Sequence, residues 1–378
     1  MKYKLSDICH YRKGKVDVSL LTDDTYISTE NMIPNRGGIT KAATLPTVDS
    51  TQLYKKGDIL VSNIRPYFKK IWQATCDGGC SNDVLVFQAN EGFDQDYLYY
   101  VLSDDAFFAY AMKTSKGTKM PRGDKHSIMQ YETEVCDLAT QRKIASLLKS
   151  IDSKIDLNKA INNNLMQQAK TIFEAEIVNR TELPNGWEKS NLASIANYLN
   201  GLAMQNYRPT DDDQGFPVLK IKELRQGACD ADSERCSSYI KSNYIVNDGD
   251  VIFSWSGSLL VDFWCGGICG LNQHLFKVTS TQYAPWFFYS WTNYHLAKFA
   301  AIASAKATTM GHIKRSDIEA AEVVIPSSAD YERIGALIQP LYDLCIALKL
   351  ENRKLAATRD SLLPRLLSGD IVISEAII

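Results

Sequence analysis

Two short segments of this chain combine positive charge with hydroxyl-bearing side chains, a pattern suited to contact with phosphate groups. The first has five cations within thirteen residues, opposed only by Asp124: Lys113, Lys116, Lys119, Arg122 and Lys125. The second, far along the chain, contains Lys306, Thr308, Thr309, His312, Lys314 and Arg315. Interleaved Ser, Thr and Gly residues, such as Thr118, add hydroxyl and backbone N–H donors for phosphate oxygens.

A solvated loop face explains most charge clusters of this kind. Here the cluster occurs twice, so a binding role is favoured as strongly as a solvated loop face. We expect three further cations that follow an apolar, strand-like run to extend the first segment: Arg65, Lys69 and Lys70. The formal net charge of the whole chain is only −2, so any nucleic-acid binding must depend on local charge.

Motifs for catalysis are missing from the sequence. Asn63-Ile-Arg-Pro-Tyr67 is faintly similar to the Asn/Asp-Pro-Pro-Tyr element of amino-methyltransferases, but it lacks the first Pro, and no Gly-rich cofactor loop precedes it. No phosphate-binding G-x-x-x-x-G-K-[ST] loop occurs either. We therefore expect a non-catalytic chain without catalytic residues or a bound cofactor.

Two Cys-x-x-x-Cys pairs, Cys76/Cys80 and Cys265/Cys269, are the only candidates for metal ligation. A structural zinc needs four ligands, and neither pair has a second pair or a His at suitable spacing. Small buried core residues are the better interpretation, and we expect no metal. Nine cysteines at irregular spacings also argue against a disulfide framework.

The cationic segments belong to a chain that is an internal repeat. Leu5-Ser-Asp-Ile8 recurs as Leu192-Ala-Ser-Ile195, and Gly57-Asp-Ile-Leu60 recurs as Gly249-Asp-Val-Ile252. Asn82 matches Asn272, Met120 matches Met310 and Ile128 matches Ile318. Each similarity is weak alone, but their common order and near-constant offset indicate two variations on one unit.

Each unit begins with short β-branched and aromatic runs separated by Gly, Asn and Asp, together with helical stretches. This pattern predicts an α+β fold, with two similar domains separated by a long antiparallel two-helix coiled coil and related by a pseudo-two-fold repeat. The expected boundaries are 1–137 for the first α+β domain and 138–180 for its helix. The second domain is expected at 181–327, its helix at 328–368 and a C-terminal tail at 369–378.

The two long helices are predicted from apolar residues on alternating steps of four and three, sustained over more than three heptads. A less favoured alternative is that each helix packs only on its own domain. Asn162 and Asn352 occupy equivalent positions in this seam. A polar Asn there weakens packing but specifies register, so we expect the two side chains to lie close together in an antiparallel pair.

The duplicated architecture resembles the specificity subunit of type I restriction–modification systems over nearly the whole chain. The resemblance rests on Leu183-Pro-Asn-Gly-Trp187, Leu271-Asn-Gln-His-Leu275, Val324-Ile-Pro326 and the repeated Gly-Asp segments. It departs from the family pattern at the start of the first unit, which lacks the Leu-Pro-x-Gly-Trp opening.

The resemblance implies a cytoplasmic, non-membrane protein that binds double-stranded DNA at a bipartite, asymmetric site. Each recognition domain would read one half, and the helices would dock two modification (methyltransferase) subunits, which bind S-adenosylmethionine. Two restriction subunits, which are ATP-dependent translocases and nucleases, can join this complex. A coiled-coil scaffold without DNA recognition is the alternative, although such a scaffold would not need duplicated cationic loops.

Overall fold

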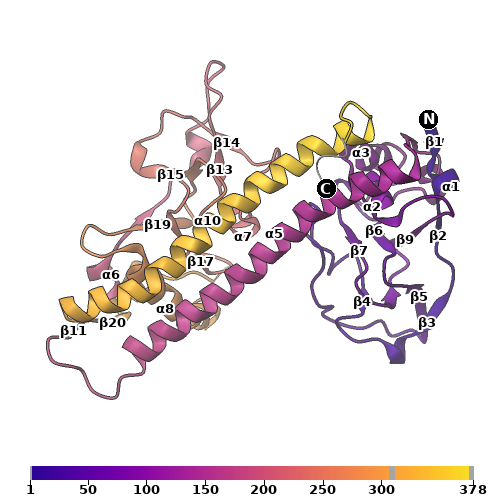
Figure 1. Cartoon of the computed structure of the whole chain (residues 1–378). Helices are drawn as coiled ribbons and strands as arrows, with labels where there is room; N and C mark the ends of the chain where they lie inside the picture. The colour runs from indigo at the N-terminus through magenta and orange to yellow at the C-terminus, as the bar shows by residue number, and fades with distance from the viewer. Residues whose placement is uncertain (1, 306–310, 374–378) are drawn as a thin grey trace. The chain divides into compact units, whose positions relative to one another are not determined.

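The computed structural model describes residues 2–305 and 311–373 and divides into two compact units (Figure 1). The first unit runs from the N-terminus to residue 154 and resumes at residue 355, and the second contains residues 155–354. Two long helices, α5 (Leu138–Phe173) and α10 (Ser328–Leu367), are therefore each shared between the units.

The first unit has three small sheets, with strand orders β2-β9-β6-β7, β3-β5-β8-β4 and β1-β10. Its helices are α1 (Leu5–Ile8), α2 (Gln95–Ser103), α3 (Asp105–Lys113) and α4 (Lys125–Ile128). Its strands are β1 (Lys2–Lys4), β2 (Cys9–Tyr11), β3 (Lys15–Asp17), β4 (Tyr26–Ile27), β5 (Ser50–Tyr54), β6 (Ile59–Ser62), β7 (Ile71–Gln73), β8 (Gly78–Cys80), β9 (Val84–Ala89) and β10 (Glu132–Glu134).

The second unit has sheets of orders β12-β19-β16-β17, β14-β13-β18-β15 and β11-β20. Its helices are α6 (Leu192–Ile195), α7 (Ile221–Gln226), α8 (Pro285–Ala305) and α9 (Arg315–Glu319). Its strands are β11 (Glu188–Asn191), β12 (Asn197–Asn200), β13 (Phe216–Leu219), β14 (Arg235–Cys236), β15 (Ile245–Val246), β16 (Val251–Ser254), β17 (Leu260–Phe263), β18 (Cys269–Leu271), β19 (Leu275–Thr279) and β20 (Glu322–Ile325).

Strand register establishes which positions of the two units are equivalent. In the first unit Tyr11 pairs with Phe87, which pairs on its other side with Ile59. In the second unit Tyr198 pairs with Val278, which in turn pairs with Val251. Ile59 and Val251 each lie two residues after the repeated glycine. The predicted α+β fold and internal repeat are therefore confirmed.

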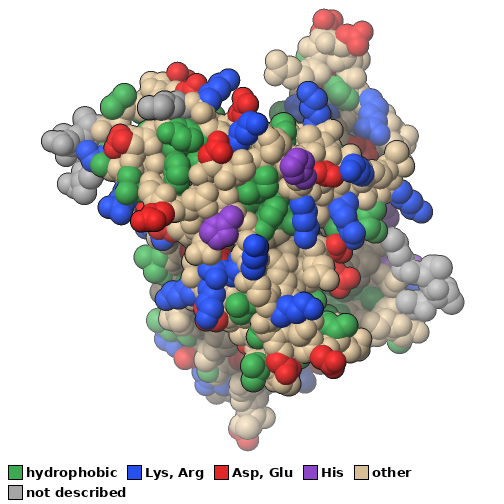
Figure 2. Space-filling model, turned by 90° about the vertical axis from the view of Figure 1, so that its right-hand side faces the viewer, with side chains coloured by type: hydrophobic (Ala, Val, Ile, Leu, Met, Phe, Trp, Pro, Cys, Tyr) green, Lys and Arg blue, Asp and Glu red, His purple; other side chains and the backbone are tan. Residues whose placement is uncertain are grey.

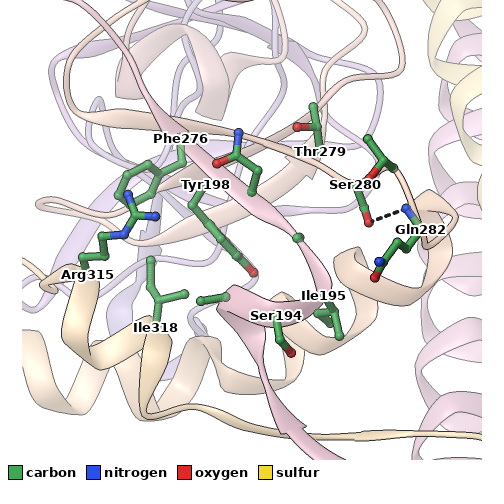
Figure 3. A pocket seen from close by; sticks show the side chains of 13 residues that line it. Ser194, Ile195, Tyr198, Phe276, Thr279, Ser280, Gln282, Arg315 and Ile318 are labelled. Atoms are coloured by element: carbon green, nitrogen blue, oxygen red, sulfur yellow. Dashed lines mark hydrogen bonds between the residues drawn. The ribbon is translucent and has the colours of Figure 1, made fainter.

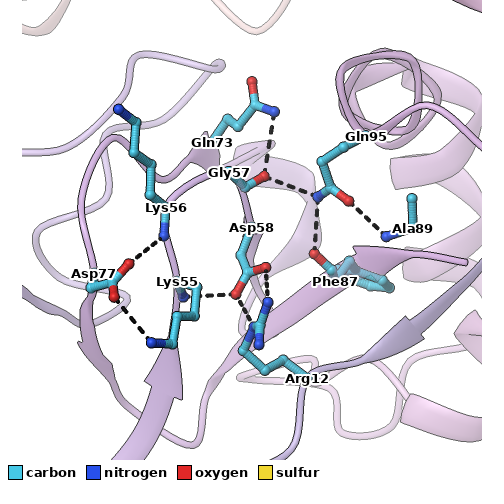
Figure 4. Close-up of polar contacts among 10 residues, drawn as sticks. All are labelled: Arg12, Lys55, Lys56, Gly57, Asp58, Gln73, Asp77, Phe87, Ala89 and Gln95. Carbon is cyan, nitrogen blue, oxygen red and sulfur yellow. Dashed lines mark hydrogen bonds and ion pairs between the residues drawn. The ribbon is translucent and has the colours of Figure 1, made fainter.

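The repeated Gly-Asp pair forms a turn that begins the central strand of each unit. Gly57 and Gly249 have φ angles of 92° and 91°, which favour glycine because a side chain there would be strained. Asp58 is buried and accepts hydrogen bonds from the Arg12 Nη2 at 2.8 Å and from the Lys55 backbone N–H at 2.8 Å (Figure 4). The aspartate therefore connects the turn to the residue that follows the edge strand β2, on the far side of β9.

The second unit forms the same turn with a cation from a different strand. Asp250 accepts from the backbone N–H of Asn247 at 2.7 Å and pairs with the Lys277 ammonium at 2.7 Å. Lys277 lies in β19 and is 13% exposed. The Gly-Asp motif therefore has a structural role, because its carboxylate holds a turn and pairs with a partly buried cation.

Within the second unit, α5 and α10 run antiparallel (Figure 1). The Asn158 Nδ2 donates to Asn352 Oδ1 at 2.8 Å, and further along the pair the Arg333 Nη2 donates to Glu176 Oε2 at 2.8 Å. The direct partner of Asn352 is thus Asn158, one helical turn before the expected Asn162. Asn162 is also buried, and its Oδ1 has no hydrogen-bond partner among the described residues.

The Asn158–Asn352 contact leads to a prediction about the stability of the helix pair. Replacing Asn352 alone with leucine should lower the free energy of unfolding by about 1–2 kcal/mol, because buried Asn158 then loses a partner. Asn158→Leu combined with Asn352→Leu should return the stability to about the wild-type value, since two apolar side chains then meet. Urea denaturation of the single and double variants measures this coupling, and purely additive losses would contradict it.

In the first unit, the pieces of the same two helices pack together around a partly buried ion pair. The Arg359 Nη1 donates to Asp152 Oδ1 at 2.7 Å, and the Tyr100 hydroxyl donates to Asp152 Oδ2 at 2.7 Å. Leu363 and Leu366 are buried in the same hydrophobic core as α2 and α3. The end of α10 is therefore part of the packed interior of the first unit.

Candidate nucleic-acid interface

In the first unit, backbone pairing brings the loop after β6 against the cationic segment that follows α3. The Arg65 backbone N–H donates to the Pro121 carbonyl at 2.8 Å, and the Gly123 N–H donates to the Asn63 carbonyl at 3.0 Å. Between them, Ile64 and Arg122 form an isolated antiparallel bridge. Arg65 thus lies beside the 113–125 segment, as predicted from the sequence.

The second unit repeats this arrangement at equivalent positions. The Gly257 N–H donates to the Gly311 carbonyl at 3.0 Å, and the Ile313 N–H donates to the Trp255 carbonyl at 3.1 Å. Ser256 and His312 form the corresponding bridge. Because these bonds join backbone atoms, the two loops keep one geometry while their side chains differ.

The cations of the 113–125 segment divide into two groups. Lys113, Lys119 and Lys125 are exposed, and their ammonium groups form no hydrogen bond or ion pair in the described parts of the chain, 2–305 and 311–373. Thr118 is exposed too. Lysine side chains without partners are available to phosphate without loss of an existing contact.

The other two cations of the segment form ion pairs. The Lys116 Nζ lies 2.7 Å from Asp124 Oδ2, and the hydrogen bond from Lys116 holds the pKa of Asp124 well below its usual range. The Arg122 Nη2 lies 2.7 Å from Asp83 Oδ1. Both cations are more than half exposed, so these pairs contribute little stability and can open toward another anion.

The cations that follow β6 are more deeply engaged. The Lys69 Nζ pairs with Asp105 Oδ1 at 2.9 Å, and the Lys70 Nζ donates to the Thr29 carbonyl at 2.6 Å. Partial burial lowers the pKa of Lys70. Arg65 is half-buried with a φ of 49°, and its Nε has no hydrogen-bond partner among the described residues. Lys69 and Lys70 therefore help to hold the loop.

In the second segment, Lys306, Thr308 and Thr309 lie outside the described residues. His312, Lys314 and Arg315 are exposed. Lys314 precedes α9 and its backbone N–H donates to Asp317 Oδ2 at 2.7 Å, while the Arg315 Nε lies 3.5 Å from Glu319 Oε1. The described part of this segment thus presents three basic side chains at one end of a short helix.

Aromatic side chains beside this segment were not anticipated from the sequence. Trp255 directly follows β16 at the position equivalent to Asn63, and its indole N–H donates to Asn200 Oδ1 at 3.0 Å. Its ring centroid lies 5.8 Å from Phe276 and 6.1 Å from His312. Comparing the two units position by position could have indicated Trp255, because an aromatic residue there replaces a polar one.

A pocket of about 450 Å³ lies next to these residues in the second unit (Figure 3). Arg315 and Phe276 lie on one side of it, and Ser280 and Gln282 lie on the opposite side.

Figure 2 shows lysine and arginine side chains gathered across the middle of one face of the molecule, around two histidines. Positive charge is thus locally concentrated although the net charge is slightly negative.

The described residues contain no group of three or more His, Cys, Asp or Glu side chains that could hold a metal ion. All nine cysteines are free thiols, with Cys80, Cys265 and Cys269 buried and Cys76 half-buried. No helix in the described ranges is long and apolar enough to cross a membrane. That the chain needs no metal or cofactor stays a prediction.

Two copies of one α+β unit, each with a backbone-held cationic loop, define a duplicated nucleic-acid-recognition protein. The chain belongs to the family of the type I restriction modification DNA specificity domain, whose family model matches residues 1–167 and again residues 184–357. The family resemblance inferred from the sequence is thereby confirmed.

Individual relatives agree with this assignment. The chain is 25% identical over 356 residues to the type I restriction enzyme MjaIX specificity subunit of Methanocaldococcus jannaschii, a match covering 86% of this chain and 80% of the relative. It is 19% identical to the HindI specificity subunit of Haemophilus influenzae, covering 98% and 99% of the two chains. The solved type I S subunit from M. genitalium has the same fold, with a TM-score of 0.58 at 14% identity and coverage of 97% and 96%.

The chain therefore has the role of a DNA specificity subunit in a type I restriction–modification system. The alternative, a coiled-coil scaffold without DNA recognition, is not supported.

Proposed function

We propose that each recognition domain reads one half of a bipartite, asymmetric DNA site and that the long helices dock two modification subunits. One observation carries this proposal: the cationic loop is held by the same backbone bonds in both units while its side chains differ. Two loops with the same backbone geometry but different side chains are suited to two half-sites of different sequence. The domain boundaries expected from the sequence, 1–137 and 181–327 for the recognition domains, are part of this proposal.

In this proposal the chain is itself non-catalytic and works in the cytoplasm. Two ATP-dependent restriction subunits can join its complex with the methyltransferase subunits. Within this proposal, the DNA-contacting residues are the cations of the two loops. Lys113, Lys119 and Lys125 are the strongest candidates because they have no partners among the described residues. Phosphate contacts of this kind set the position of a protein on DNA but carry no sequence information.

Methylome sequencing of cells that express this chain with its modification subunits tests the proposed function. We expect methylation at a motif with two unequal specified blocks separated by unspecified base pairs, lost when the gene for this chain is deleted. Purified chain alone should show no methyltransferase, nuclease or ATPase activity. A single uninterrupted motif, or methylation that persists after the deletion, would refute the proposal that this chain reads the two halves of a bipartite site.

A further inference from the structure

Each unit has a surface pocket at the same place in its fold. The first pocket, of about 320 Å³, is lined by Tyr11, Arg12, Gln52, Leu85 and Lys125 among others. The second pocket, of about 640 Å³, is lined by Tyr198, Leu199, Tyr244, Phe276 and Arg315 among others. This second pocket shares Tyr198, Phe276 and Arg315 with the pocket of Figure 3, so these two pockets of the second unit adjoin.

The equivalence of the two pockets follows from the strands and helices around them. Tyr11 and Tyr198 occupy the same register position on an edge strand. Lys125 and Arg315 are the first residues of α4 and α9, the helices that follow the cationic loops. A pocket beside the cationic loop is therefore a feature of the repeated unit, and a cation at its rim is present in both copies.

Much of the lining of the first pocket is polar, although Leu85 and Val86 also line it. Lys15, Gln52 and Asn82 line it, and their side chains form no hydrogen bond or ion pair in the portion of the chain that the structure describes. Arg12 is different, because Asp58 holds its guanidinium. The first pocket thus offers hydrogen-bonding groups that have no internal role.

The second pocket has a more apolar and aromatic lining than the first, although Asn197, Asn200, His312 and Lys314 also line it. In the repeat, Leu199 takes the place of Arg12 and Tyr244 that of Gln52, while Phe276 replaces the smaller apolar Leu85. Trp255, also in the lining, is half-buried. Its indole N–H is already bonded to Asn200, which leaves the carbon surface of the ring for contact.

These two chemistries match the two ways in which proteins distinguish bases in the major groove. Gln, Asn and Lys bind purine edges, at N6/N7 of adenine or O6/N7 of guanine, whereas apolar side chains contact the 5-methyl group of thymine. We propose that the paired pockets are the base-reading surfaces, with Gln52 and its polar neighbours reading a purine in one half-site. Trp255 reads a thymine in the other half-site. Lys125 and Arg315 contact the adjacent phosphates.

This inference rests on the proposed function and is tested with the complex of this chain and its modification subunits on the duplex that methylome sequencing identifies. Deoxyuridine in place of thymine removes only the methyl group, and 7-deazapurines remove only the N7 acceptor. With the wild-type complex, one deoxyuridine in the second half-site should weaken binding about tenfold, and one 7-deazapurine in the first half-site should do the same.

Variants then assign these effects to residues. With Trp255→Ala the deoxyuridine penalty should disappear while the 7-deazapurine penalty remains, and Gln52→Ala should show the reverse. Tyr239→Ala is the matched aromatic control, since Tyr239 is 85% exposed and lies outside both pockets. This control should keep both penalties.

Failure of the proposed function and failure of the base-reading inference give different results. A complex whose binding ignores one half-site altogether would overturn the proposed function. If both half-sites matter but the second contains no A·T pair, or wild-type complex tolerates deoxyuridine there, the thymine inference is wrong. Penalties that persist in Trp255→Ala and Gln52→Ala place base reading elsewhere. The measurements on wild-type complex need no variant, so a misfolded Trp255→Ala does not block the test.

Discussion

Replacing Asp58 with alanine should lower the free energy of unfolding of this protein by about 3 kcal/mol. The Asp58 side chain is 3% exposed, and its removal leaves the Arg12 guanidinium, which is 19% exposed, without its counter-charge. Breaking a buried ion pair by deleting one partner typically costs about 3–5 kcal/mol. We expect the lower end because Arg12 can recover part of its hydration. The turn at Gly57 also loses the bond from Lys55.

Asp77 provides a matched control on the neighbouring turn (Figure 4). It pairs with the Lys55 Nζ at 3.2 Å, but both side chains are more than half exposed. Asp77→Ala should therefore change the free energy of unfolding far less than Asp58→Ala does. Urea denaturation of the two variants under the same conditions compares them. Equal losses would mean that the burial of Asp58 does not determine its contribution.

Replacing Lys113 and Lys119 with alanine should weaken binding of the assembled complex to its DNA about thirtyfold near 0.15 M salt. Each phosphate contact releases about one counterion, so the loss of two should reduce the slope of log affinity against log salt concentration by about 2. The loss should be the same for specific and unspecific duplexes, because phosphate contacts do not depend on sequence. A salt titration of binding measures both quantities.

The control variant removes two lysines that already have carboxylate partners. Lys41 lies 3.0 Å from Asp24, and Lys55 lies 3.2 Å from Asp77. Lys41→Ala with Lys55→Ala should leave the slope within experimental error of the wild type. If the two double variants have equal slopes, Lys113 and Lys119 serve only as solvated side chains of a loop.

The sequence was sufficient to predict features that depend on local pattern and on repetition. The glycine of the Gly-Asp pair, needed for a positive φ, marks the start of the central strand in both units. The seam of apolar residues predicted long antiparallel helices, and α5 and α10 are present. These features are readable because each is encoded by neighbouring residues, or by one pattern that occurs twice.

Features that depend on distant residues could not be read in this way. Both Lys69 and Lys119 are lysines of a cationic segment, yet Lys69 pairs with Asp105 while Lys119 forms no ion pair with any described residue. The partner of Asn352 was placed one turn from its observed position, because a heptad pattern gives the buried face of each helix but not the axial stagger between them. Trp255 is functional in our proposal only through the rings that the fold gathers around it.

The end of α10 also determines when the first unit can finish folding. Arg359 and Asp152 are separated by 207 positions, and the whole second unit lies between them in the chain. During synthesis, residues up to 154 leave the ribosome long before residue 355, so Asp152, which accepts from Tyr100, initially lacks its arginine partner. The N-terminal unit is thus the first to be made and the last to be completed. A premature stop after residue 354 would damage the interior of the N-terminal unit, far away in sequence.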